Sequence, residues 1–147
     1  MKINRKKQQG ATFITWLIVA GFMVLTASAV LKVAPYYIEF NSVKSMMKDI
    51  AGEAGIKTAN KHEINKKVAR YLNVNNLRGL EKTFYASKSG DGKTKNPFQI
   101  VRLKKGDNRK KLVVNYPVET PWISNLSFLI KFQHEVVLGE PDNISGR

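Results

Sequence analysis

The hydrophobic residues of this chain follow three patterns in turn. Residues 11–31 are an apolar run that contains no charged residue. A helix over that run would be about 31 Å long at 1.5 Å per residue, which matches the hydrocarbon core of a bilayer. From residue 36 to residue 72 the apolar positions recur every three or four residues, and from residue 80 they tend to alternate. These patterns predict a transmembrane helix, then amphipathic helices, then strands.

Two helices are predicted after the apolar run. The first covers residues 36–54, and Pro35 in front of it either kinks a continuous helix or starts a new one. We expect this helix to continue directly from the membrane-spanning segment. The second begins after Asn60, because Glu63 three residues later completes a capping box, and it runs to about Leu72.

Alternation predicts up to four strands, over residues 80–87, 97–103, 111–119 and 126–138. The first has the weakest alternation and the last has the strongest. Pro117 lacks the N–H that a central strand needs, so it predicts an edge or a bulge. Helices followed by strands are typical of an α+β domain. We therefore expect an N-terminal transmembrane helix, two helices and an antiparallel sheet of three or four strands.

Charge asymmetry predicts how the chain is placed in a membrane. The basic residues Lys2, Arg5, Lys6 and Lys7 precede the apolar run, and Lys32 alone follows it closely. Basic residues favour the cytoplasmic side, so those four set the topology with a cytoplasmic N-terminus at the inner membrane. The predicted division is a basic cytoplasmic segment (1–10), a transmembrane helix (11–31), a periplasmic α+β domain (32–138) and a flexible tail (139–147).

Two other interpretations of the N-terminus predict cleavage. Residues 27–29, Ala-Ser-Ala, fit the rule for a secretory signal peptide, which would be cut after Ala29. The sequence KKQQG before ATFIT resembles a type IV prepilin leader, which would be cut after Gly10. Pilins carry a glutamate at the fifth position after that cut, and this chain has Thr15 there, which argues against pilin assembly. Gly10 and Ala29 are thus the candidate processing sites.

The chain is strongly basic, with a formal net charge of +14 at pH 7. Such an excess suits an anionic partner such as anionic lipid or lipopolysaccharide, and a solvated surface has the same composition. Two predicted loops concentrate the charge, and their basic residues are the candidate anionic-surface site: Lys93, Lys95, Lys104, Lys105, Arg109, Lys110 and Lys111. Neither loop interleaves the stacking aromatic residues that single-stranded nucleic acid requires, which argues against a nucleic-acid partner.

The sequence contains no recognisable pattern of catalytic or metal-binding residues. The chain has no cysteine, and His62 and His134 have no metal-ligand spacing. The carboxylates are scattered singly, without a pair at helical or strand spacing that suggests an acid and a base. The sequence KSGDGKTK lacks the spacing of a P-loop. These patterns favour a protein that is not an enzyme and that needs no cofactor.

Four short motifs occur along the chain in order: QQG (8–10), PYY (35–37), SVK (42–44) and VNN (74–76). In this order they resemble a family of small single-pass inner-membrane proteins of proteobacteria, a domain of unknown function that is often encoded beside signal peptidase I. The resemblance implies an anchored protein with an extracytoplasmic domain. It supplies no reaction and no catalytic residues.

We therefore expect a non-enzymatic inner-membrane protein with a basic periplasmic domain. Its role would be that of a scaffold or accessory in cell-envelope maintenance or cell division, with other envelope proteins as partners. One alternative is a pilin-like subunit of a secretion or DNA-uptake machine. The other is a module that binds polyanions or anionic lipid.

Overall fold

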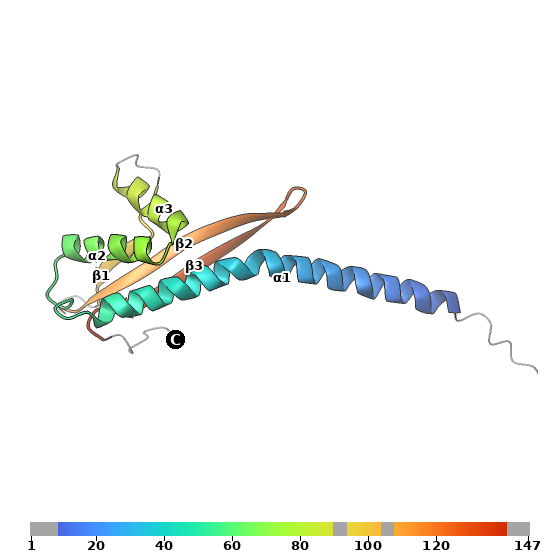
Figure 1. Ribbon diagram of the computed structural model, residues 1–147, viewed down its shortest axis with the longest axis horizontal. Coiled ribbons are helices and arrows are strands. Elements are labelled where there is room, and N and C mark those ends of the chain that lie inside the picture. The colour runs from blue at the N-terminus through green and yellow to red at the C-terminus, as the bar shows by residue number, and fades with distance from the viewer. Residues whose placement is uncertain (1–8, 90–93, 104–107, 141–147) are drawn as a thin grey trace, which may run out of the picture.

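The computed structural model describes residues 9–89, 94–103 and 108–140. Its elements, in chain order, are α1 (Gln9–Gly52), α2 (Lys61–Val74), α3 (Arg78–Lys88), β1 (Phe98–Arg102), β2 (Lys110–Ile123) and β3 (Leu126–Val137) (Figure 1). The strands form one antiparallel sheet in the order β1-β2-β3. The predicted α+β class is confirmed, with an apolar N-terminal helix, two further helices and a three-stranded sheet.

The first helix, α1, has 44 residues and continues through Pro35. It bends near its middle (Figure 1), as expected where a proline removes a backbone hydrogen bond. Its first half projects from the domain with large apolar side chains exposed, and Trp16 is 70% exposed. By length and composition this helix is able to cross a membrane. Its second half belongs to the core, where five side chains are fully buried: Val43, Met46, Met47, Ile50 and Ala51.

The helices cover one face of the sheet and leave the other face open. Along β2, buried residues such as Val114 and Tyr116 alternate with residues that are exposed or partly exposed. The register pairs Val114 with Phe98 of β1 and Tyr116 with Phe132 of β3, so these four side chains share one face. Phe40 of α1 contacts Phe132, Phe84 of α3 contacts Phe98, and α2 packs on both of these helices.

Phe132 is the central contact between α1 and the sheet, and it is 3% exposed. The centroid of its ring lies 5.4 Å from that of Tyr37 and 4.7 Å from that of Phe40, both in α1. The ring of Tyr116 in β2 lies 5.5 Å away on the same face. Aromatic pairs at these distances add to the free energy gained by burial. They hold the second half of α1 on β2 and β3.

The second helix, α2, begins and ends at residues that suit its termini. The predicted capping box is confirmed, because the Asn60 side chain accepts a hydrogen bond from the Glu63 N–H and the Glu63 carboxylate accepts one from the Asn60 N–H, both at 2.8 Å. After its last turn, Asn76 takes a φ of 55°, and the Leu77 N–H donates to the Leu72 carbonyl at 3.0 Å. This is a Schellman turn, which ends α2 and lets α3 begin at once.

The strand predicted over residues 80–87 is wrong, because these residues belong to α3. Leu77, Leu80 and Phe84 are spaced by three and four, and all three are buried on one side of the helix. Phe84 packs on Phe98 of β1 with ring centroids 6.1 Å apart. The segment is therefore helical despite its weak alternation, because its apolar residues have helical spacing and the Schellman turn lets a helix begin directly before them.

The second strand, β2, is longer than predicted and continues to Ile123. Residues that were expected to connect two strands are thus mostly strand, and the turn itself is residues 124–125. Pro117 lies in the central strand, but β1 does not extend far enough to pair with it. The Asn115 N–H donates to the Pro97 carbonyl at 2.9 Å, and the next position on that edge is Pro117. The predicted edge is confirmed, and the register shift lies further on, between Pro121 and Ile123.

His134 of β3 lies against α1, with the Phe40 ring edge-on at 6.5 Å between centroids. Burial lowers the pKa of His134 from its ordinary value of 6.5, the positive charge of Lys44 lowers it further, and Glu135 partly opposes both. His134 is therefore a partly buried histidine that favours its neutral form.

Replacing Phe132 by alanine is expected to lower the free energy of unfolding by about 3 to 5 kcal/mol, because it opens a cavity among three rings. Phe128→Ala is the matched control, four residues earlier on the same face and only partly buried. Its effect should be smaller. Urea unfolding of the full chain in detergent micelles measures both variants, and equal losses would contradict the central role of Phe132.

Stability is expected to fall as the pH decreases from 6.5 through the lowered pKa of His134. In that window the unfolded chain binds a proton more strongly than the folded chain, so the free energy of unfolding rises with pH. His134→Gln should flatten this dependence, because it removes the group whose pKa is lowered by folding. Thermal unfolding at several pH values tests this. An unaltered slope in His134→Gln would show that other groups cause the dependence.

Candidate functional site

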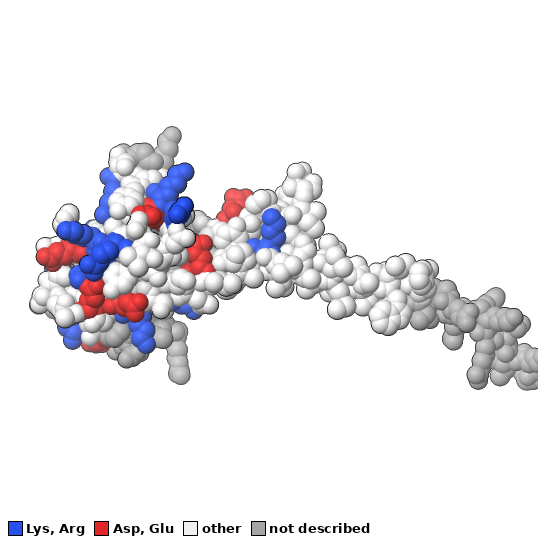
Figure 2. All heavy atoms as spheres, viewed as in Figure 1, with Lys and Arg blue, Asp and Glu red and all other residues white. Residues whose placement is uncertain are grey.

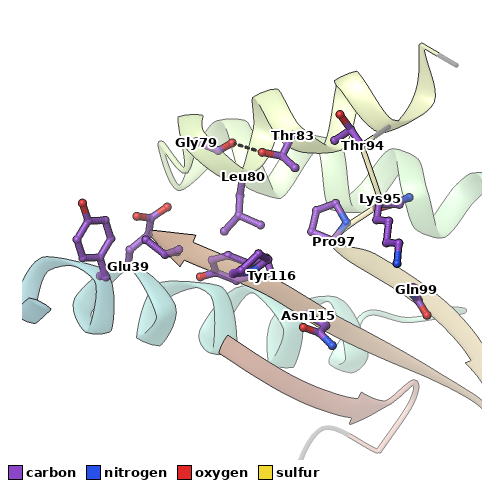
Figure 3. Close-up of a pocket in the computed structure, with 14 residues that line it drawn as sticks. Glu39, Gly79, Leu80, Thr83, Thr94, Lys95, Pro97, Gln99, Asn115 and Tyr116 are labelled. Carbon is purple, nitrogen blue, oxygen red and sulfur yellow. Dashed lines mark hydrogen bonds between the residues drawn. The ribbon is translucent and has the colours of Figure 1, made fainter. Parts of the chain in front are cut away.

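A groove opens between α1, α3, β2 and the residues that precede β1 (Figure 3). Its volume is about 870 Å³, which is in the range of ligand and peptide sites. Glu39 from α1, Leu80 from α3 and Tyr116 from β2 converge at one end of it, and Lys95 and Pro97 lie toward the other (Figure 3).

The walls of the groove follow from the packing of α1. Tyr36 and Glu39 are three residues apart, so they share one side of this helix. The adjacent side carries Tyr37 and Phe40, which pack on Phe132. Packing of those rings therefore turns Tyr36 and Glu39 toward the groove.

The end of the groove near Tyr116 is electrically unusual. Burial raises the pKa of the Tyr116 hydroxyl well above its ordinary value, and the negative charge of Glu39 raises it further. The hydroxyl therefore stays protonated and available as a hydrogen-bond donor at physiological pH. Within the described part of the chain, Glu39 makes no hydrogen bond or ion pair, so its carboxylate is open to a cationic or donor group of a ligand.

One wall of the groove is the edge of β2 that β1 leaves uncovered. Pro117 lines this edge and has no N–H. A peptide that added to the edge as a further strand would find a carbonyl acceptor there without the matching donor, which disfavours strand addition. Recognition in the groove would therefore depend on side chains.

The described lining of the groove contains few groups that titrate or act as nucleophiles. It contains one carboxylate, Glu39, and no histidine. The Thr83 hydroxyl, a nucleophile by residue type, is engaged in a hydrogen bond to the Gly79 carbonyl at 3.0 Å (Figure 3). No group of three or more His, Cys, Asp or Glu that could hold a metal ion occurs among the described residues.

Several basic residues of the predicted anionic-surface site have partners inside the protein. The Lys110 ammonium donates to the Ala59 carbonyl at 2.7 Å, and that of Lys111 pairs with the Glu135 carboxylate at 2.7 Å. Arg109 lies 3.6 Å from the Glu140 carboxylate. The carboxylates offset the positive charge of Arg109 and Lys111, whereas the carbonyl of Ala59 engages the ammonium of Lys110 without neutralising it.

The other members of that predicted site are separated or lie outside the described residues. Lys95 is exposed and lines the groove, whereas Lys110 pairs with Arg102 at the opposite end of β1. Lys93, Lys104 and Lys105 lie outside the described ranges. Among the described members, Lys95 is therefore separated from Arg109, Lys110 and Lys111, as expected for two different loops of the sheet.

The N-terminal candidates are placed only in part. The topology-setting residues, Lys2, Arg5, Lys6 and Lys7, lie outside the described ranges. Gly10 lies at the start of α1 and Ala29 lies within it, so cleavage after either residue would cut this helix.

The groove is not apparent from the sequence. Tyr116 alternates with core residues, which predicts an ordinary core position. Glu39 has the pattern of a solvated residue on an amphipathic helix. One feature of the sequence points to the groove: a carboxylate lies three residues after Tyr36, close to the proline of the PYY motif. This feature indicates a site only once β2 is known to lie next to α1.

Comparison with known proteins gives one match. No curated protein and no solved structure shows a significant similarity to this chain. The family described as Domain of unknown function (DUF4845) matches residues 32–132, which is more than half of the chain. The match begins where the uncharged run ends and finishes at Phe132. The predicted membership of a family of unknown function is confirmed, and this protein belongs to the DUF4845 family.

Proposed function

We propose that this protein is a non-enzymatic, single-pass inner-membrane protein whose basic domain works in the periplasm. Its role is that of a scaffold or accessory in cell-envelope maintenance or cell division. The observation that carries the proposal is the continuity of α1, which has an exposed apolar first half and a buried second half within one helix.

The exposed half of α1 supports a membrane anchor on energetic grounds. Its large apolar side chains include Phe13, Trp16, Phe22 and Leu31, each between 68% and 75% exposed. Removing such a side chain from water is worth about 1.5 to 3 kcal/mol. A bilayer buries all of them at once, and no other described element covers them.

The orientation rests on the basic residues before the anchor. Lys2, Arg5, Lys6 and Lys7 favour a cytoplasmic N-terminus, which sends the domain to the periplasm. Passage of the helix through Ala29 without a break favours an anchor that is retained over a signal peptide that is removed.

A scaffold role suits a domain that is rigidly joined to its anchor. The side chains of Tyr36 and Glu39 follow the end of the apolar run by only a few residues, so the groove would lie roughly 10 Å beyond it along the helix. At that height the groove can meet the periplasmic end of another membrane protein. Glu39 and the protonated hydroxyl of Tyr116 supply the polar contacts for such a partner.

The second candidate, a pilin-like subunit, is favoured by the same exposed half of α1. After a cut at Gly10, that half would be free to pack against copies of itself. Thr15, where pilins have glutamate, argues against it.

The topology is testable because the chain has no cysteine. A single cysteine at Gln133, which is exposed on the open face of β3, should react with a membrane-impermeant maleimide in intact spheroplasts. A single cysteine at Asn4 is the matched control and should react only after lysis. The reverse pattern would overturn the proposed orientation.

The intact mass of the membrane-extracted protein distinguishes the candidates. An anchor that is not processed should retain Gly10 and Ala29, and the mass should match the full chain. A mature chain that begins at Ala11 would replace the anchor proposal with the pilin-like subunit. One that begins at Val30 would indicate a released periplasmic protein.

A further inference from the structure

The hairpin of β2 and β3 ends in a segment without charge. Residues 120–130, TPWISNLSFLI, contain no Asp, Glu, Lys or Arg, and we refer to them as the hairpin tip. Three of its large apolar side chains are open to solvent: Ile123 at 41%, Leu126 at 63% and Leu129 at 62% exposure. On the side that faces α1, the rings of Trp122 and Phe128 pack together with centroids 5.1 Å apart. The hairpin tip thus exposes apolar side chains to solvent in addition to the pair of rings that is packed on the side of α1.

The hairpin tip lies beside the uncharged run of α1 (Figure 1). Its base is tied to the helix by the Tyr36 hydroxyl, which donates to Thr120 Oγ1 at 3.2 Å. Further out, the Trp122 indole N–H donates to Ser28 Oγ at 3.4 Å. Ser28 is inside the run of residues 11–31 that would be in the bilayer. An anchor that spans the membrane therefore brings the hairpin tip to the membrane with it.

Both elements have an uncharged segment that is bounded by charged residues on the side of the domain. On α1, the uncharged run ends at Lys32, and on the hairpin, Glu119 and Lys131 flank the tip. In Figure 2 the charged side chains gather over the domain, whereas the end of the hairpin and the described exposed half of α1 carry none. The two uncharged surfaces are continuous along the molecule.

We propose that the hairpin tip enters the interface of the bilayer, in the leaflet on the domain's side, as a second membrane contact beside α1. This inference rests on the proposed function, because it requires α1 to span the membrane. The partner is lipid, since the exposed side chains of the tip continue the apolar surface of the anchor. The indole of Trp122 suits this depth, where amphipathic rings are favoured.

The depth of the hairpin tip is limited by its backbone. Open strand edges are not tolerated in the hydrocarbon core, because unpaired N–H and C=O groups cannot be satisfied there. Ser28 is four residues before Lys32, so the contact at Trp122 lies about 6 Å below the end of the uncharged run. That is the depth of an interfacial element, about 5 to 10 Å. Pro121 lowers the cost further, because it leaves no N–H to desolvate on the outer edge of β2.

A second contact would fix the tilt of the domain against the membrane plane. With one helical anchor, α1 can tilt in the bilayer, and the groove then changes its height and angle above the membrane surface. With the hairpin tip also in the interface, the side of α1 that faces the sheet is held toward the lipid surface. The groove, lined by Tyr36 and Glu39 beside that side, then keeps a constant height and angle toward a partner in the same membrane.

The test uses single cysteines in the full chain, labelled with the environment-sensitive fluorophore NBD. The probe site is Leu126, which is exposed beside the turn and pairs with Ile123, and the control is Gln133, which is exposed on the same strand closer to the domain. A third label at Phe22 reports on the anchor itself. The labelled proteins are reconstituted in vesicles of phosphatidylethanolamine and phosphatidylglycerol. Quenching is measured with aqueous iodide and with lipids that carry a nitroxide at a shallow or a deep position.

The label at Leu126 is expected to emit at shorter wavelength than that at Gln133, to be shielded from iodide and to be quenched more by shallow than by deep nitroxide. If it is as open to iodide as Gln133 while Phe22 is quenched by deep nitroxide, the hairpin proposal is overturned and the anchor stands. If Phe22 is also open to iodide, the anchor itself fails.

Shielding of the label at Leu126 by protein must be distinguished from shielding by lipid. A label that is protected from iodide but not quenched by either nitroxide lipid, with protection that disappears on dilution into more lipid, would indicate a second copy of the chain on the hairpin tip. That result would overturn the assignment to lipid. Unfolding in urea of the variant labelled at Leu126, compared with that of the variant labelled at Gln133, verifies that the label has not disrupted the hairpin.

Discussion

The packing of Phe132 between Tyr37 and Phe40 determines how the two halves of this protein relate to each other. A helix of 44 residues in isolation would have no fixed relation to a sheet at its end. Because the rings of α1 that contact Phe132 begin two residues after Pro35, the sheet is attached to the helix directly beyond its exposed half. The edge of β2, the groove and the hairpin tip all take their positions from this one contact.

Proline placement explains how β2 can be both a central and a partly uncovered strand. At Val114 it pairs on both sides, with Phe98 and with His134. Beyond Asn115 only β3 accompanies it, and an uncovered edge of that length invites pairing with another chain. Pro117 and Pro121 fall on this edge and remove two of its donors. The prolines thus protect the edge without interrupting the ladder between β2 and β3.

The sequence was most informative where the period of apolar residues was long and regular. The capping box at Asn60 and Glu63 and the alternation that ends at Val136 predicted α2 and β3 from local chemistry alone. The segment over residues 80–87 was assigned to a strand because its eight residues are too few for a period to be clear. Its helical state is decided by the Schellman turn at Asn76 and by the burial of Phe84 on β1.

The candidate sites were harder to predict because they depend on which elements are neighbours. Clustered lysines suggested a site, but a local count of charge does not reveal that Lys111 is paired with Glu135 or that Lys110 is bound to the Ala59 carbonyl. Glu39 and Tyr116 are 77 positions apart and meet only because α1 crosses β2.

Some exposed apolar residues of this fold are isolated on the surface, whereas others belong to a surface that can contact the membrane. Val101, at 42% exposure, stands singly on the open face of the sheet, where isolated apolar residues are common and need no partner. Leu126 and Leu129 are more exposed and belong to a continuous uncharged segment that Trp122 ties to the anchor. Exposure alone would treat these residues alike, whereas their distance from the uncharged run of α1 separates them. The same contact that stabilises the core, Phe132 on α1, sets that distance, so the packing of the domain also decides which of its surfaces can reach the membrane.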